Sequence, residues 1–502
     1  MKKFNKDKYL KKLKLKRFWQ NNSRYFYIGV PCILCGILGI YFAYSKFFVS
    51  QGQEVVRATV APFIRGDVVI NNYINGKLVD EAPAKATGYK VDKIVCDNGA
   101  VGEWNGIDWG PAISNVTRRS KCNIYFVPND KINIGNVKLT LDEFNECPSL
   151  NEDGSINVTK VEYSKGYICK AKDAYGDSYY YRGNVTNNYV KFGKWSKDTP
   201  DVVIGFSSAT STYFKEYSTV KECQSARSYN VNCTVISKAN KDMYWRIIRI
   251  NGDGTVRVIY DGTSVHANGE SSTDRQIGTS AFNSSSNDNA YVGYMYGSAN
   301  ASTYQATHAN TNNSTIKAYL DTWYGNNIKS TTNEQYIVDN IFCNDRSFSP
   351  KNTGTGVSAS ETYYRGNDSI DNFYNKGLLL TCPQQNDAFT LNDTINGNGA
   401  LTYGIGLITL DEATMAGGWT SYNNNKFYLY TGQDFWTMTP NGRYTYALSL
   451  AIIELSAYTS TVNGYISSRT IKSNNGVRPV LNLKSDILLK GTGTADDPYR
   501  LS

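Results

Sequence analysis

Cysteine is the residue type with the most chemistry to offer in this sequence, and its distribution predicts disulfides rather than catalysis. Two of the ten cysteines lie in an apolar N-terminal segment, and eight lie beyond it. The chain has only two histidines, His266 and His308, and none of the eight cysteines is spaced as CxxC. We therefore expect no metal site built on cysteine or histidine.

An even number of cysteines in an oxidising compartment indicates four disulfides. Eight cysteines allow many connectivities, and the simplest joins neighbours along the chain, because each bond then closes one local loop within one module. The expected pairs are Cys96–Cys122, Cys147–Cys169, Cys223–Cys233 and Cys343–Cys382.

Motifs for nucleophilic or metal-assisted catalysis are missing from the sequence. It contains neither G-x-S-x-G nor H-E-x-x-H, and its Asp and Glu residues are scattered rather than paired. We therefore expect a protein that is not an enzyme and that carries no catalytic residues. An enzyme of unknown reaction remains the second alternative.

Aromatic and amide side chains are the other groups that could bind a ligand. The chain has 39 tyrosines, and an aromatic, Asn-rich segment covers 419–436. Aromatic rings stack on sugar faces, and amides donate to and accept from hydroxyl groups. The candidate ligand-binding residues are Trp419, Tyr422, Asn423, Asn424, Tyr428 and Trp436. The alternative is that most of these side chains fill a core, as Tyr and Trp do on many β surfaces.

The N-terminal residues predict on which side of a membrane the rest of the chain lies. Residues 1–24 form a basic tail with ten Lys and Arg and one acid, Asp7, and residues 25–45 are uncharged and long enough to span a bilayer. The positive-inside rule places the tail in the cytoplasm and the rest of the chain outside the cell. We expect an uncleaved signal anchor, a single-pass cell-membrane protein and a partner membrane at 25–45.

The charge of the chain excludes one class of partner. The net charge is +9, from 53 basic and 44 acidic residues, and the first 24 residues account for all of this excess. The remainder holds 43 side chains of each sign and is neutral. We therefore expect no nucleic-acid partner, because no basic excess remains outside the tail to attract a polyanion.

Composition and turn residues divide the chain after the apolar segment. Residues 46–60 are expected to form a stalk, and 61–128 a small β-sandwich module, because short β-branched and aromatic runs alternate there with Asn, Gly and Pro. Residues 129–160 are polar and predict a connector. The remainder, 161–502, is long enough for one large α+β domain.

Several local signals predict elements within that domain. Residues 243–262 predict a hairpin, because two β-rich runs flank the turn NGDG. Helical spacing predicts a helix over 314–325 and a second amphipathic stretch over 333–342. Thr409 and Glu412 predict a capping box at the start of a short helix that follows a strand.

Three blocks in the C-terminal region resemble a known fold. IGLITLDEATMAGG at 405–418, FWTMTP at 435–440 and NGVRPVLNL at 475–483 are similar to segments of the formylglycine-generating-enzyme-like fold, a variant of the C-type-lectin fold. Residues 90–502 also resemble large membrane-anchored surface proteins of low-GC bacteria, a resemblance that implies no particular activity. The expected fold class is therefore a single N-terminal transmembrane helix, a small all-β (immunoglobulin-like sandwich) module and a large α+β C-type-lectin-like/formylglycine-generating-enzyme-like domain.

This resemblance implies little chemistry. Formylglycine-generating enzymes oxidise with active-site cysteines, and this chain has none after Cys382, so the catalytic part does not carry over. Arg478 matches the arginine of the closing strand and is expected to be structural. No cofactor is expected. Calcium is suggested only by analogy with lectin-like folds.

Topology and composition favour one function over the others. We expect an extracellular, non-catalytic binding module, an adhesin or receptor for a glycan or another surface protein. The first alternative is a structural protein of the cell envelope, which the long neutral ectodomain would suit.

Overall fold

The computed structural model describes two units of the chain separately. The described residues are 11–17, 68–74, 76–83, 89–105, 109–128, 131–134, 137–140, 147–148, 150–158, 165–209, 214–366, 377–418, 424–443, 447–452, 466–484 and 490–501. The smaller unit holds those up to 85 and from 90 to 127, and the larger holds 86–89 and those from 128 onward.

The expected transmembrane helix is not supported by the structure. No helix in the described ranges is long and apolar enough to cross a membrane. The predicted segment 25–45 and the predicted stalk 46–60 lie outside those ranges. The single N-terminal transmembrane helix of the expected fold class therefore has no support among the described residues.

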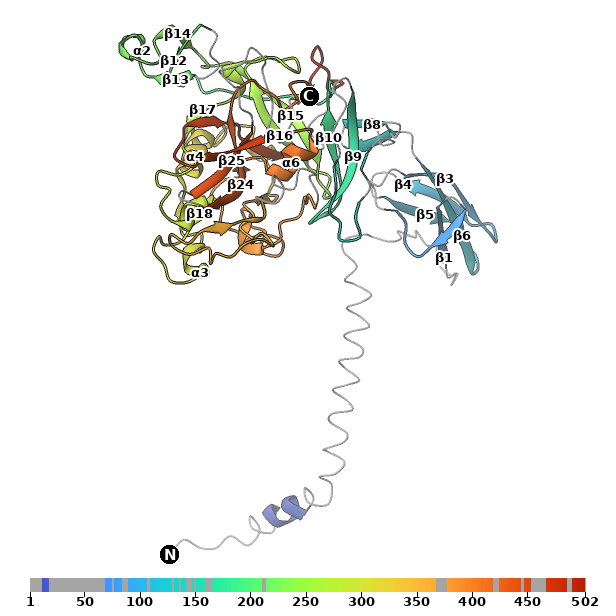
Figure 1. Ribbon diagram of the computed structural model, residues 1–502. Coiled ribbons are helices and arrows are strands. Elements are labelled where there is room, and N and C mark those ends of the chain that lie inside the picture. The colour runs from blue at the N-terminus through green and yellow to red at the C-terminus, as the bar shows by residue number, and fades with distance from the viewer. Residues whose placement is uncertain are drawn as a thin grey trace, which may run out of the picture. The chain divides into compact units, whose positions relative to one another are not determined.

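From residue 68 onward, the described part of the smaller unit is built from strands (Figure 1). One sheet has the order β2-β1-β6-β3, with β1 and β6 parallel, and β4 pairs with β5 in a separate hairpin. Buried Ala100, Ile113 and Cys122 form its core. The bounds are β1 Val68–Ile74, β2 Lys77–Val79, β3 Tyr89–Cys96, β4 Val101–Asn105, β5 Gly110–Ser114 and β6 Ser120–Pro128.

Three main sheets form the larger unit, and short strand pairs accompany them. The first has eight strands in the order β23-β28-β16-β15-β10-β9; β11 also pairs with β15, and β29 pairs with β11. Its bounds are β9 Gly166–Asp173, β10 Gly176–Gly183, β11 Tyr189–Lys194, β15 Asp242–Ile250, β16 Val256–Gly262, β23 Ile405–Gly406, β28 Val480–Leu483 and β29 Tyr499–Arg500.

The second sheet has six strands, and the third has three. The second runs β17-β27-β24-β25-β26, with β21 paired to β24, and the third runs β13-β12-β14. Their bounds are β12 Val202–Phe206, β13 Phe214–Tyr217, β14 Val231–Ile236, β17 Gly278–Ser280, β21 Thr362–Tyr363, β24 Phe435–Arg443, β25 Ala447–Ile452, β26 Ile466–Thr470 and β27 Asn475–Val477. The short pairs are β7 Lys131–Ile134 with β8 Val137–Thr140, β18 Met295–Tyr296 with β19 Asn312–Asn313, and β20 Phe342–Cys343 with β22 Ala388–Phe389.

The expected α+β class is wrong, because the described residues are mostly in strands and loops. The α-helices of the larger unit are α2 Val220–Ser225, α3 Tyr304–Thr307, α4 Thr315–Asn327 and α6 Leu410–Met415. Among these described helices only α4 is longer than two turns, and residues 11–17 form one short helix that is assigned to the smaller unit. The prediction for 333–342 was also wrong, since only Glu334–Tyr336 is helical there, as a single 3₁₀ turn.

Predictions that rest on local rules are confirmed. Strands β15 and β16 form the expected hairpin. Ser314 caps α4, its side chain accepting from Lys317 N, and Thr409 and Glu412 form the expected capping box on α6. All four disulfides join the expected neighbours. Four disulfides fit an extracellular or secreted protein.

The predicted connector is part of the larger unit. Ile156 and Leu378 exchange backbone hydrogen bonds of 2.9 and 3.0 Å, and both side chains are fully buried. They pack with Val158 and Cys169 in a small apolar cluster. The polar composition of 129–160 gave no sign that Ile156 is a core residue, because its partner Leu378 lies far along the chain.

Candidate functional site

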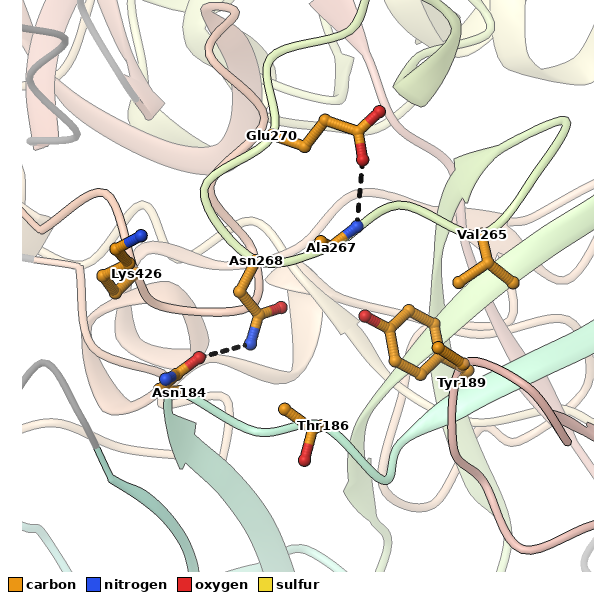
Figure 2. Close-up of a pocket in the computed structure, with 9 residues that line it drawn as sticks. Asn184, Thr186, Tyr189, Val265, Ala267, Asn268, Glu270 and Lys426 are labelled. Carbon is orange, nitrogen blue, oxygen red and sulfur yellow. Dashed lines mark hydrogen bonds between the residues drawn. The ribbon is translucent and has the colours of Figure 1, made fainter.

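An open pocket of about 810 Å³ lies at one end of the eight-stranded sheet (Figure 2). Four separate chain segments surround it, at the ends of strands and in the loops that follow them. Its lining residues are Asn184, Thr186, Tyr189, Val265, Ala267, Asn268, Glu270, Lys426 and Ala495.

Strand ends fix these segments in place. Asn184 and Thr186 lie in the turn between β10 and β11, and Tyr189 begins β11. The amide of Tyr189 donates to Gly493 O at 2.8 Å, which holds the C-terminal loop beside the pocket. The loop 263–272 follows β16 directly, so one strand positions four of the nine lining residues.

Asn268 is the most firmly held polar group of the pocket. Its amide nitrogen donates to Asn184 Oδ1 and Val185 O, both at 2.8 Å, and its Oδ1 accepts from Arg246 Nη1 at 3.0 Å. Arg246 is fully buried and stacks on the Tyr189 ring, with its guanidinium carbon 3.8 Å from the ring centroid. A buried cation therefore lies directly behind the pocket floor.

Further buried arginines reinforce this positive floor. Asp261 accepts hydrogen bonds of 2.8 Å from Arg275 Nη2 and from Arg478 Nη2, and Arg246 Nη1 lies 3.9 Å from its other oxygen. Three guanidinium groups thus share one carboxylate. Other N–H groups of these arginines donate to backbone carbonyls, among them Glu270 O. Arg478 is buried and donates to Asp261 and to the carbonyls of Tyr260 and Leu429, so it holds distant segments together.

A histidine held between two carboxylates borders the pocket. His266 Nδ1 lies 2.7 Å from Glu270 Oε1, and His266 Nε2 lies 2.9 Å from Asp274 Oδ1. Burial alone would lower the pKa of His266, but the hydrogen bonds and charges of Asp274 and Glu270 raise it above its ordinary value. Burial would likewise raise the pKa of Asp274, and His266 instead holds it below its usual range.

Both nitrogens of His266 are occupied, so the imidazole is not positioned to take a proton from a bound molecule. Its role is to fix Glu270, which also accepts from Ala267 N at 3.0 Å (Figure 2). No group of three or more His, Cys, Asp or Glu in the described residues could hold a metal ion. The arrangement therefore suits binding by hydrogen bonds and charge.

Three side chains of the pocket are available to a ligand. Lys426 and Thr186 are exposed, and Asn184 is partly exposed. Within the described ranges the Lys426 ammonium, the Thr186 hydroxyl and the Asn184 amide N–H groups have no protein partner. Figure 2 shows Lys426 across the pocket from Tyr189 and Val265, with Asn184 and Thr186 along a third side.

The structure places half of the predicted binding residues in the core. Asn424, Tyr428 and Trp436 are fully buried. Asn424 donates to Gly417 O at 2.8 Å, and the Trp436 indole donates to Ser280 O at 2.8 Å. Trp419, Tyr422 and Asn423 lie outside the described residues, so their ligand-binding role stays a prediction.

Sequence reasoning missed most of the pocket. Lys426 falls within the predicted 419–436 segment, but Asn184, Asn268 and Glu270 come from stretches whose composition predicts turns and surface loops. No local signal joins segments so far apart in the chain. Searches of protein-family models, curated proteins and solved structures find no match to this chain, so its suspected family resemblance stays untested.

Proposed function

We propose that this chain is an extracellular, non-catalytic binding protein whose pocket takes a hydroxyl-rich ligand such as the end of a glycan. One observation carries the proposal: fixed polar groups and free polar groups alternate around an open pocket. Asn268 is held by three hydrogen bonds and Glu270 by two, while Lys426, Thr186 and Asn184 retain free groups within the described part of the chain. Groups that are already fixed lose little entropy when a ligand binds.

Apolar surface beside these groups supports the same ligand class. Tyr189, Val265, Ala267 and Ala495 offer carbon surface for the C–H face of a sugar. The buried Arg246 polarises the Asn268 amide from behind. A ligand with many acceptor oxygens and some apolar surface therefore matches both the polar groups and the apolar surface of the pocket.

A glycan array with the purified protein, followed by calorimetry on each hit, tests the proposal. Loss of one hydrogen bond costs about 1 kcal/mol, or roughly fivefold in affinity, and bonds to charged groups cost more. We expect Asn184→Ala to weaken binding about fivefold and Lys426→Met about tenfold. The matched control is Lys484→Met, an exposed lysine outside the pocket, which leaves affinity unchanged.

Two results would contradict this function. One is a flat array with protein that is folded and fully disulfide-bonded. The other is an equal loss of affinity in Lys426→Met and Lys484→Met. A flat array combined with concentration-dependent self-association would favour the structural alternative.

A further inference from the structure

A second cavity, of about 550 Å³, lies in the larger unit and shares no lining residue with the first pocket. One wall comes from the three-stranded sheet, through Ile204 and Ile236, and another from α4, through Tyr319 and Trp323. Trp195, which follows β11, forms part of the remaining wall. The two cavities can therefore be tested separately.

Two tryptophans make the cavity aromatic. The rings of Trp195 and Trp323 meet edge to face with centroids 5.8 Å apart, and they are 5% and 6% exposed. The Trp195 indole donates to Tyr260 Oη at 3.0 Å. The Trp323 indole Nε1 is buried and has no acceptor among the described residues. A buried donor without an acceptor is costly, so Trp323 marks a place for an acceptor atom.

One cation faces this cavity. Lys238 Nζ donates to Gln276 O at 2.7 Å and to Ile277 O at 3.2 Å, and it lies 4.9 Å from the Trp195 ring centroid. An ammonium group has three N–H donors, so one remains. No described carboxylate lies within 4 Å of this Nζ. Burial lowers the pKa of Lys238 to about 8, which leaves it mostly charged at neutral pH.

Two anions line the same cavity, the exposed Asp198 and the partly buried Glu216. Glu216 Oε2 accepts from Thr279 N at 3.2 Å and from Thr279 Oγ1 at 3.1 Å. Its other oxygen has no hydrogen bond within the described part of the chain, and no described cation lies within 4 Å of it. Burial raises the pKa of Glu216. Glu216 and Lys238 are thus both anchored by uncharged groups, and neither lies within 4 Å of an opposite charge among the described residues, although the charge of each acts on the pKa of the other.

We propose that this cavity binds a small zwitterion with an apolar body, an α-amino acid with an aromatic or branched side chain. The ligand carboxylate would pair with Lys238 and accept from the Trp323 indole, and the ligand ammonium would pair with Glu216. The apolar side chain would pack on Trp195 and Ile204. A cation and an anion that are each held only by uncharged groups, a free indole donor and aromatic walls are together satisfied by this ligand class.

Three probes that share a benzyl group test this assignment by calorimetry on the whole protein. L-phenylalanine carries both charges, phenylacetate only the carboxylate and phenethylamine only the ammonium. We expect L-phenylalanine to bind at least about tenfold more tightly than either of the others. No detectable binding of L-phenylalanine, or equal binding of all three probes, would overturn the assignment.

Variants separate the two charge contacts. Lys238→Met should weaken L-phenylalanine and phenylacetate roughly 10- to 100-fold and leave phenethylamine unchanged. Glu216→Gln should weaken L-phenylalanine and phenethylamine and spare phenylacetate. The matched control is Lys484→Met, an exposed lysine that lines neither cavity, which should affect none of the probes. A uniform loss across the probes in either charge variant would contradict the proposed contacts.

A further variant keeps the assignment testable if the charge variants do not fold. Trp323→Phe keeps an aromatic ring and removes only the indole donor. We expect it to weaken L-phenylalanine and phenylacetate about tenfold and to spare phenethylamine. Unchanged affinity for all three probes would refute the proposed acceptor position at Trp323. The proposal is independent of the glycan pocket, since its probes and variants leave that pocket intact.

Discussion

Replacing Glu412 with glutamine separates two roles that this side chain has in the structure. As part of the capping box on α6, its Oε2 accepts from Thr409 N at 3.0 Å. As a counter-ion, its Oε1 lies 2.7 Å from Arg257 Nε and 3.0 Å from Arg249 Nε, all three residues being buried. Glutamine keeps an oxygen for the cap but removes the charge.

The two roles predict different losses of stability. A helix cap contributes about 1 kcal/mol, whereas breaking a buried ion pair costs about 3–5 kcal/mol, because a charge is left uncompensated. The larger unit spans about 375 residues, so at roughly 2.1 cal/mol/K per residue its unfolding entropy is about 0.8 kcal/mol/K. We therefore expect Glu412→Gln to lower Tm by about 4–6 °C.

The chain offers a matched control for this experiment. Thr219 and Glu222 form a second capping box on α2, and Glu222 is exposed. Because no buried arginine depends on it among the described residues, Glu222→Gln should lower Tm by about 1 °C or less. Scanning calorimetry on both variants measures the difference. Equal shifts in Tm would refute the counter-ion role of Glu412.

Three further outcomes follow from contacts in the larger unit. The raised pKa of His266 means that this histidine stabilises the fold fully below its unfolded pKa, about 6.5, and that the stabilisation is lost as pH rises through its folded pKa. Urea midpoints should therefore show the largest loss of stability in His266→Gln, relative to the unmutated protein, near about pH 5.5. A loss of stability that does not depend on pH would argue against the ion pairs. Trp436→Ala should cost about 3–5 kcal/mol in denaturant titrations, because it empties a fully buried site; lost ligand binding at unchanged stability would instead support a binding role. Cys343→Ser should destabilise more than Cys223→Ser, by roughly 4 against 3 kcal/mol, because the bonds span 39 and 10 residues; a reversed order in calorimetry would contradict this loop-entropy argument.

The sequence was a poor guide to the fold class and to which side chains are exposed at the surface. An α+β domain was expected because amphipathic stretches such as 333–342 suggest helices, yet the larger unit also uses very short strands, such as β23, whose partners lie far along the chain. Strands of about two to four residues are too short to show a period of two. Tyr428 and Trp436 could equally have lined a pocket or filled a core, since side-chain type alone does not give direction.

By itself, the sequence determined the features whose interactions close within a few residues or within one loop. These are the β15–β16 hairpin, the Ser314 and Thr409 caps and the four neighbouring disulfides. Only the tertiary structure decided which residues form the pocket, where Asn184, Asn268 and Lys426 come together, and that Glu412 is a buried counter-ion. The physical reason is that backbone caps and turns are local, whereas burial and charge pairing are settled by which distant strands lie side by side.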